Sequence, residues 1–380
     1  MPSRALASAA ASVATQQAAA ALHGVFAVNK PAGISCTGVL DYLKRNLGLA
    51  AGATPFAEHF AREAELRATG RKIRRPRTPL DLRVGHGGTL DVEAAGVLVV
   101  GLGRGCKQLD AYLRGPKAYV ADARLGLATD THDAEGRVTL LADAAHVDAE
   151  AIRRALPRFT GDIWQPPPMF SAARVDGRRL YEYARAGLSP PAAPKARSVH
   201  VGAIDLVSLS NPAAGHAFGR PARLPADAQQ YYAGGRRQWA AGRGQPRVGD
   251  VLLAYANDPA QAHMQLAVRC GGGVYVRSLV HDIGRHVGSA ATMLTLVRLA
   301  QGALRLDRDA IAVDDLAYVD RVAQAIRHAQ DLTASVEPSL SNTLFHPAGS
   351  CGGSPVHRSS ADGAPAGRAP PAYAQNANPA

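Results

Sequence analysis

The chain has few cysteines, few aromatic residues and no long apolar run. Its four cysteines, at positions 36, 106, 270 and 351, show no C-x-x-C spacing, so neither a disulfide framework nor a zinc site is expected, and a reducing compartment is favoured. No stretch reaches the roughly 18 apolar residues that a membrane span needs. The phosphate-binding pattern G-x-x-x-x-G-K-[ST] is also absent, which argues against a P-loop nucleotide-binding protein.

Positive charge, by contrast, is abundant. The 380 residues include 43 Lys and Arg against 31 Asp and Glu, a formal net charge of +12. Such an excess predicts an anionic partner, for which nucleic acid is the first candidate. The charge is unevenly distributed, because residues 62–83 hold eight basic and three acidic side chains. The apolar fraction of 47% is sufficient for a large core.

Composition divides the chain into three parts. Residues 1–22 are rich in Ala and Ser and predict a disordered leader, with a transit peptide as the alternative. Residues 334–380 are mostly Pro, Ala, Ser, Gly and Asn, which predicts a disordered tail. Between them we expect one folded domain at 23–333, with insertions at about 50–80 and 211–260. The first insertion is expected to form a short helix and then a basic segment that is mobile without a ligand.

The most informative stretch is V-G-H-G-G-T-L-D-V-E-A-A-G-V-L, from Val84 to Leu98. Its glycines at 85, 87 and 88 permit backbone conformations that side chains would block, and the apolar run at Val97 to Val100 predicts a buried strand. Asp91 is therefore expected on a constrained loop, as a nucleophile or a base. The alternative is a tight turn in which Asp91 caps a short helix through Val92 to Ala95.

A second pattern overlaps this one. The segment V-L-V-V-G-L-G-R-G, from Val97 to Gly105, is similar to a strand entering a glycine-rich phosphate loop, and Asp122 follows at a spacing that suits a ribose contact. The match fails in detail, because Cys106 stands where the third glycine is required and Asp122 lies inside a predicted strand. Dinucleotide binding is therefore disfavoured.

Apolar periodicity predicts both strands and helices. A strand from Val25 leads to a capped helix, and residues 117–127 alternate as a strand that points Tyr119 inward beside small residues. Further along we expect a helix over 151–159, an extended stretch from 165 that ends in a helix at 180–186, strands around 198–206 and 264–270, and a helix over about 276–287. Tyr275 and Arg277 lie off the apolar stripe of that last helix, free to face a ligand.

Five sequence elements occur in a recognisable order. They are K-P-A-G-I-S at 30–35, V-G-H-G-G-T-L-D at 84–91, K-A-Y at 117–119, Q-P-P-P-M-F-S-A at 165–172 followed by Y-E-Y-A-R-A-G at 181–187, and G-V-Y-V-R-S-L-V-H-D-I-G at 273–284. Together they resemble the TruB family of tRNA pseudouridine synthases, in particular the eukaryotic-type enzymes without a C-terminal RNA-binding domain. The resemblance covers about residues 25–302, outside the two insertions. It implies an α+β pseudouridine synthase fold, with a mixed, mainly antiparallel sheet flanked by helices and a central RNA-binding cleft.

The resemblance also implies a reaction, the isomerisation of uridine to pseudouridine, with uridine 55 in the T-arm of tRNA as the target and with no cofactor and no metal. It makes Asp91 the catalytic carboxylate, which attacks C1′ or assists an elimination that frees the base. Arg277 matches the arginine that pairs with this aspartate and keeps it ionised. Tyr119 matches the tyrosine that stacks on the target base and can act as general base.

Three further residues are implied in substrate binding. His86 matches the histidine that stabilises the opened RNA loop after the uridine flips out, Tyr275 is expected to line the pocket, and Lys30 to contact RNA phosphate. From the residues alone, the alternatives are a turn residue, a packing residue and a solvated lysine. The expected partner is the T-arm of tRNA, with mRNA as a second candidate, and we expect a monomer with no membrane and no obligate protein partner. The expected location is the nucleus or the cytoplasm, with the mitochondrion also open.

Two departures from the family pattern keep other functions open. Where the family continues P-L-A-S-G after the aspartate, this chain has V-E-A-A-G at 92–96, and Glu93 places a negative charge near Asp91. The family element G-T-Y reads G-V-Y at 273–275. The alternatives are an RNA-binding or RNA-folding protein of the same fold that has lost turnover, and a synthase that acts mainly on mRNA or organellar RNA.

Overall fold

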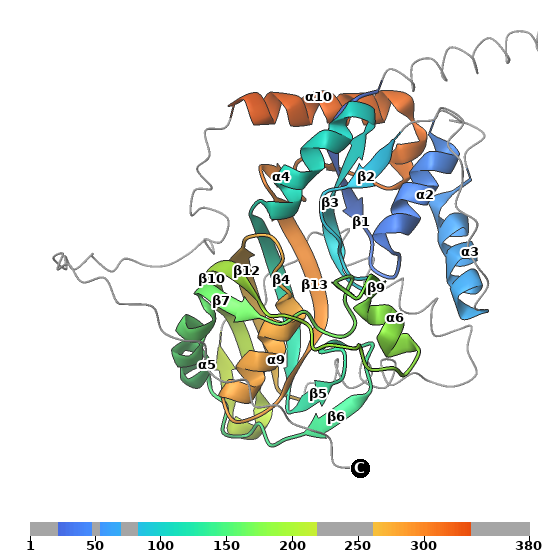
Figure 1. Ribbon diagram of the computed structural model, residues 1–380. Coiled ribbons are helices and arrows are strands. Elements are labelled where there is room, and N and C mark those ends of the chain that lie inside the picture. Colours follow the sequence, from blue (N-terminus) through green and yellow to red (C-terminus); the bar gives the residue numbers. More distant parts are fainter. Residues whose placement is uncertain (1–21, 48–53, 70–82, 219–260, 336–380) are drawn as a thin grey trace, which may run out of the picture. The chain divides into compact units, whose positions relative to one another are not determined.

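An 11-stranded mixed sheet runs through the part of the chain that the computed structural model describes, residues 22–47, 54–69, 83–218 and 261–335. The main path of the sheet has the order β11-β10-β12-β4-β13-β3-β1-β15, and β2, β7 and β14 pair off this path. Figure 1 labels the longer strands of this path, from β10 to β1. Its strands are β1 (Gly24–Lys30), β2 (Val84–His86), β3 (Ala95–Leu102), β4 (Lys117–Leu125), β7 (Gly161–Gln165), β10 (Arg197–Asn211), β11 (His216–Phe218), β12 (His263–Cys270), β13 (Ala291–Gln301), β14 (Leu304–Arg305) and β15 (Ala310–Ile311). Two hairpins lie outside it, β5 (Leu127–Thr129) with β6 (Val138–Leu141), and β8 (Arg174–Val175) with β9 (Arg178–Arg179).

A short parallel joint connects two halves of this sheet. Among the strands described, β3 with β13 and β1 with β15 run parallel, and the other pairs are antiparallel. The β3–β13 joint pairs Ala95 with Val297 and Gly96 with Arg298. Gly96 has a φ of 103°, and a Cβ at this position would collide with the backbone of Arg298. Only glycine therefore permits so close a crossing.

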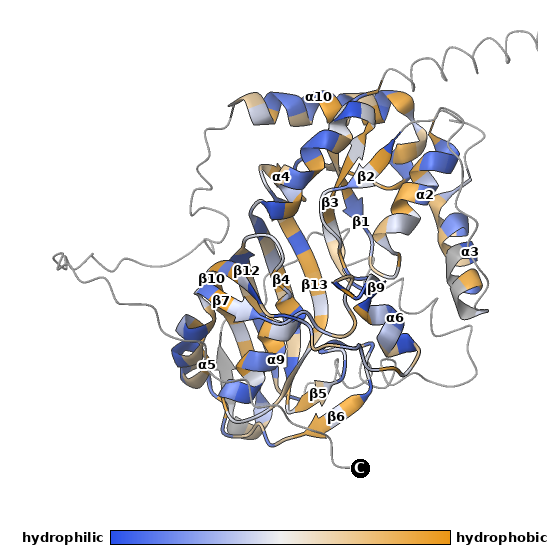
Figure 2. Cartoon of the chain, in the orientation of Figure 1, coloured by the Kyte–Doolittle hydropathy of each residue, from blue (hydrophilic) through white to orange (hydrophobic). Residues whose placement is uncertain are grey.

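Seven α-helices are described beside the sheet: α2 (Cys36–Asn46), α3 (Phe56–Ala68), α4 (Leu109–Arg114), α5 (Ala149–Ala155), α6 (Leu180–Arg185), α9 (Val276–His286) and α10 (Val319–Ser335). Ser35 caps α2, because its hydroxyl accepts a hydrogen bond from the backbone N–H of Gly38 at 2.9 Å. Helix α9 turns one apolar face into the main core, the face formed by Val276, Leu279, Val280 and Ile283. Helix α10 has both hydrophobic and hydrophilic residues and packs against β1 (Figures 1 and 2).

Period-two alternation explains how single strands serve two cores. In β1, Phe26 and Val28 belong to the main core, whereas Val25 and Ala27 belong to a second cluster on the opposite face. In β4, the residues that share the face of Tyr119 are all buried in the main core: Ala121, Ala123 and Leu125. The inward direction predicted for Tyr119 is thus confirmed.

The α+β class and the mixed, mainly antiparallel sheet are confirmed. The predicted strands are present as β1, β4, β10 and β12, and the predicted helices as α2, α5, α6 and α9, with α3 at the start of the first insertion. The short helix considered for Val92 to Ala95 is wrong, because the chain makes a turn there. After β3 the chain enters a 3₁₀ turn at Gly103–Gln108, where a Cβ on Gly105 would collide with the backbone of Gly24. That glycine therefore allows close packing against β1.

Several predictions from the sequence concern residues outside the described ranges. The leader falls almost wholly there, as do the basic segment at 70–82, residues 219–260 of the second insertion and the tail from 336 onward. Of the helices in the described ranges, none combines the length and the apolar character needed to cross a membrane.

Candidate active site

Asp91 is displayed on a turn between β2 and β3. Gly88, with a φ of 145°, brings the chain away from β2, and Leu90 anchors it in the core at 4% exposure. The backbone N–H of Ala94 then donates to the carbonyl of Asp91 at 3.1 Å, which closes the turn before β3 begins. The side chain of Asp91 is 42% exposed. The sequence expectation of a carboxylate on a constrained loop is therefore met.

Lys30 holds this turn from behind. Its side chain is completely buried, and its ammonium group donates to the carbonyl oxygens of Pro31, Val92 and Ala94 at 2.9, 3.1 and 2.6 Å. Burial lowers the pKa of Lys30 to about 8, although the neighbouring negative charges, including that of Asp91, oppose the shift. The expectation that Lys30 contacts RNA phosphate is wrong, because the group is enclosed and its three donors are already used.

Cys36 fixes the residue that precedes Asp91. Its thiol donates to the carbonyl of Leu90 at 3.4 Å and accepts from the backbone N–H of the same residue at 3.1 Å. The backbone N–H of Gly33 also donates to the carbonyl of Val92 at 2.8 Å. The segment from Lys30 to Cys36 thus bonds to the chain both before and after Asp91. Sequence reasoning missed Cys36, because its partners are backbone groups 54 residues away.

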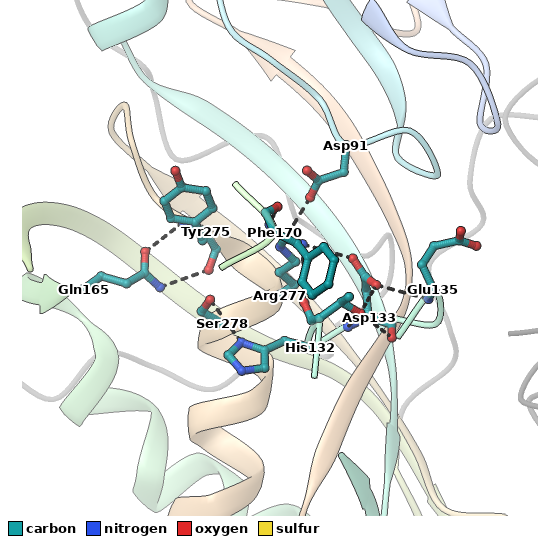
Figure 3. A network of polar contacts seen from close by, with 10 residues as sticks. Asp91, His132, Asp133, Glu135, Gln165, Phe170, Tyr275, Arg277 and Ser278 are labelled. Atoms are coloured by element: carbon teal, nitrogen blue, oxygen red, sulfur yellow. Dashed lines mark hydrogen bonds and ion pairs between the residues drawn. The ribbon is translucent and has the colours of Figure 1, made fainter. Parts of the chain in front are cut away.

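Arg277 lies at the centre of the site and faces two carboxylates. Its side chain is 4% exposed, and Nε lies 3.6 Å from Oδ2 of Asp91, an ion pair beyond hydrogen-bond length. Nη1 lies 3.3 Å from Oδ2 of Asp133 and donates to the carbonyl of Thr131 at 3.3 Å, while Nη2 donates to the carbonyl of Phe170 at 2.7 Å (Figure 3). The ion pair expected between Asp91 and Arg277 is therefore present, and Asp133 is an addition that the sequence did not reveal.

Asp133 is the more firmly held of the two carboxylates. Thr131 donates its hydroxyl to Asp133 Oδ1 at 2.5 Å, and the backbone N–H of Glu135 donates to the same oxygen at 3.1 Å. Burial nevertheless raises the pKa of Asp133, and the charge of Arg277 works against that rise. Arg277 is thus fixed by Asp133 and by two carbonyls, while the longer contact to Asp91 leaves that half-exposed carboxylate free to reach a sugar. The acidic turn T-D-T-H-D was the available signal in the sequence.

Tyr119 and Arg298 face each other across the β4–β13 pair. Burial raises the pKa of Tyr119, and the charge and hydrogen bond of Arg298 oppose the rise. A phenol with a raised pKa keeps its proton at neutral pH, so this form of Tyr119 can stack or donate but cannot accept a proton. Arg298, which is 1% exposed, also donates to the carbonyls of Val97 at 2.6 Å and Gly88 at 3.1 Å. It therefore ties Tyr119 to the chain on both sides of Asp91, and sequence reasoning missed it.

His86 and Tyr275 are the other two residues expected to bind substrate. His86 is half-buried on β2, and burial followed by the charge of Arg298 lowers its pKa, so the ring is neutral at pH 7. Tyr275 is the N-cap residue of α9, and its backbone N–H and carbonyl both bond to the side chain of Gln165, at 2.8 and 3.0 Å (Figure 3). Its ring centroid lies 6.0 Å from the guanidinium carbon of Arg277, which places it beside the ion pair.

The sequence of this chain is similar to those of known proteins. The model of the TruB family pseudouridylate synthase N-terminal domain matches residues 72–218. Human pseudouridylate synthase TRUB1 is 35% identical over 311 residues, covering 82% of this chain and 70% of the relative. The tRNA pseudouridine synthase 4 of Schizosaccharomyces pombe is 34% identical over 332 residues, which cover 75% of this chain and 80% of the relative.

A solved Cbf5-Nop10-Gar1 complex aligns with a TM-score of 0.39 at 19% identity, over 80% of this chain and 55% of that one. The identity and the coverage of the full-length relatives are the decisive comparison. The chain belongs to the TruB family of pseudouridylate synthases.

Proposed function

We propose that this chain isomerises uridine to pseudouridine in tRNA and that its target is uridine 55 of the T-arm. One observation carries the proposal: Asp91 is a half-exposed carboxylate on a turn held from behind, and its guanidinium partner Arg277 is buried. Relatives that share the family bear the names pseudouridylate synthase and tRNA pseudouridine synthase, which supports the same reaction here.

The chemistry requires a carboxylate close to C1′ of the uridine. The C1′–N1 bond breaks, the uracil turns within the pocket, and a C1′–C5 bond forms; the proton on C5 leaves and N1 ends with a proton, so there is no net oxidation. Asp91 serves either by adding to C1′ or by assisting elimination. Arg277 places a positive charge beside Asp91 without occupying its oxygens in a short hydrogen bond, because Nε lies 3.6 Å from Oδ2. Tyr119 supplies a ring on which the uracil stacks.

The uridine must leave the folded RNA before it can reach Asp91. Unstacking costs a few kcal/mol, and contacts to the phosphate backbone must offset this cost. A formal net charge of +12 provides the attraction. His86, neutral and half-buried, is the residue we place against the opened RNA loop.

The test compares the full chain with its Asp91→Asn variant on an unmodified tRNA transcript, with pseudouridine mapped by chemical modification and primer extension. Asp110→Asn is the matched control, because Asp110 is an exposed carboxylate on α4 that pairs with Arg114 at 3.0 Å. We expect one T-arm site with the wild type and the control and none with Asp91→Asn. RNA binding by all three proteins without any pseudouridine would refute the proposal.

The departures from the family pattern at Val92 and Glu93 do not indicate that activity has been lost. Lys30 and Gly33 hold residue 92 through its carbonyl oxygen, so the turn does not depend on the side chain there. The negative charge of Glu93 acts on the buried ammonium of Lys30, which supplies a nearby positive charge. An RNA-binding protein without turnover is therefore the less favoured function.

We also propose that the enzyme is a monomer without an obligate protein partner, that T-arm-like hairpins in mRNA are further substrates, and that it acts in the nucleus or cytoplasm with the mitochondrion as a second location. Light scattering during gel filtration measures the mass in solution, and a dimer would contradict the first point. Transcriptome-wide pseudouridine mapping with and without the gene tests the second. Imaging of a tagged full chain tests the third.

A further inference from the structure

Two histidines stack beside the ion pair and belong to different elements. The ring of His132, in the turn between β5 and β6, lies parallel to the ring of His281 on α9, with centroids 4.0 Å apart and an interplanar angle of 9°. His132 Nδ1 also lies 3.3 Å from the hydroxyl of Ser278, one helical turn before His281 (Figure 3). This stack and this hydrogen bond join the turn to the helix, in addition to the contacts of Arg277 with Thr131 and Asp133.

His132 adopts a backbone conformation that side chains rarely accept. Its φ is 65°, and within the described residues only Asp176 shares a positive φ among non-glycine residues. The carbonyl of His132 accepts from the backbone N–H of Met293 at 3.1 Å. The left-handed step turns both neighbours toward Arg277: Thr131 presents its carbonyl and Asp133 its carboxylate.

The position of His281 matters because Arg277 lies four residues earlier on the same helix. Residues four apart lie on one face of a helix, so the stack holds the turn close to the guanidinium. Burial lowers the pKa of His132 to about 3 and that of His281 to about 4. Both rings are therefore neutral at pH 7 and stack without charge repulsion.

We propose that His132 and His281 act as positioning residues, a stacked brace that holds Thr131 and Asp133 against Arg277 and thereby sets the guanidinium for Asp91. The proposal rests on the proposed isomerase function. The two histidines then contribute to the reaction without touching the RNA. Substituting either of them should therefore lower kcat rather than weaken RNA binding.

The first experiment measures kcat and KM for a T-arm hairpin with three variants of α9. His281→Ala removes the stack, and His281→Phe keeps a flat ring that cannot be protonated. His286→Ala is the control, because the ring of His286 makes an edge contact with Phe159, with centroids 5.8 Å apart, on the same helix. We expect a fall in kcat of about three- to tenfold for His281→Ala, in line with the strength of aromatic pairs, with KM unchanged. His281→Phe should restore kcat. Equal impairment of both His281 variants, or normal turnover by His281→Ala, would overturn the brace.

The second experiment asks whether the brace acts through Asp133. His132→Gly permits the left-handed conformation without a side chain, so a slow variant identifies the ring and not the backbone as the useful part. In combination with Asp133→Asn, both His132→Gly and His281→Ala should add little further loss, because the carboxylate they position is already neutral. Losses that multiply would refute action through Asp133.

Failure of the proposed function would be visible separately. If the wild-type chain makes no pseudouridine, the isomerase proposal fails while the brace can still be tested by urea unfolding. The free energies of unfolding of His281→Ala, Asp133→Asn and the double variant should then be non-additive, as for residues in one contact network. Additive values would overturn the brace without reference to activity.

Discussion

The thiol of Cys36 gives the sharpest test of how the Asp91 turn is held. In Cys36→Ala, the N–H and carbonyl of Leu90 lose the partner that now lies 3.1 and 3.4 Å away, at a residue that is 4% exposed. A buried backbone group without a partner costs about 1–3 kcal/mol. If the turn shifts to recover that energy, Asp91 moves from its position, and a loss of 1–3 kcal/mol in the transition state slows the reaction about 5- to 150-fold.

The assay is single-turnover release of tritium from RNA labelled at C5 of uridine, because the C5 proton leaves during the reaction. Cys36→Ser keeps a donor and an acceptor and should retain most of the rate. Val39→Ala is the control for lost packing, since Val39 is buried on the same helix and none of the bonds to Leu90 involve it. We expect Val39→Ala to lower the free energy of unfolding with an unchanged rate. A normal rate for Cys36→Ala, or equal slowing by Val39→Ala, would refute this account.

Three further outcomes are expected. Lys30 has a folded pKa of about 8 against an ordinary 10.5, so between these values the unfolded chain binds more protons and the free energy of unfolding rises with pH. Lys30→Met should reduce the slope of that free energy against pH, measured by urea unfolding at pH 8 to 10. An unchanged slope would contradict the burial argument. Arg298→Lys should lower kcat about tenfold or more, because one ammonium cannot reach Gly88, Val97 and Tyr119 together; fluorescence binding to tRNA should be unaffected, and a selective loss of binding would count against it. Affinity for tRNA should fall steeply between 50 and 200 mM salt, by about 10³ or more for six phosphate contacts, and a flat titration would exclude an electrostatic grip.

Much of the framework could be predicted from the sequence because local rules determine it. Alternation placed Tyr119 inward on β4, the apolar stripe placed Arg277 off the core face of α9, and the glycines before Asp91 indicated a constrained turn. Each of these properties depends on neighbours within a few residues. The order of the motifs then supplied the family resemblance.

The remaining parts of the site depend on contacts between distant segments. Asp133 and Arg277 are 144 residues apart in sequence, and Arg298 reaches Gly88 across 210 residues. Lys30 was misjudged for a related reason. Its partners are backbone carbonyls, which every residue type possesses, so their placement leaves no mark in the sequence.

The short parallel joint between β3 and β13 has a mechanical consequence. Asp91 lies on the turn that leads into β3, whereas Arg277 lies on α9, which packs against β13. These two strands pair at two positions, Ala95 with Val297 and Gly96 with Arg298. The 3.6 Å separation between the carboxylate and the guanidinium therefore depends on how the two strands are held together at this joint. We expect a substitution that shifts the joint to change this separation and to lower the rate of the reaction even where the protein stays folded.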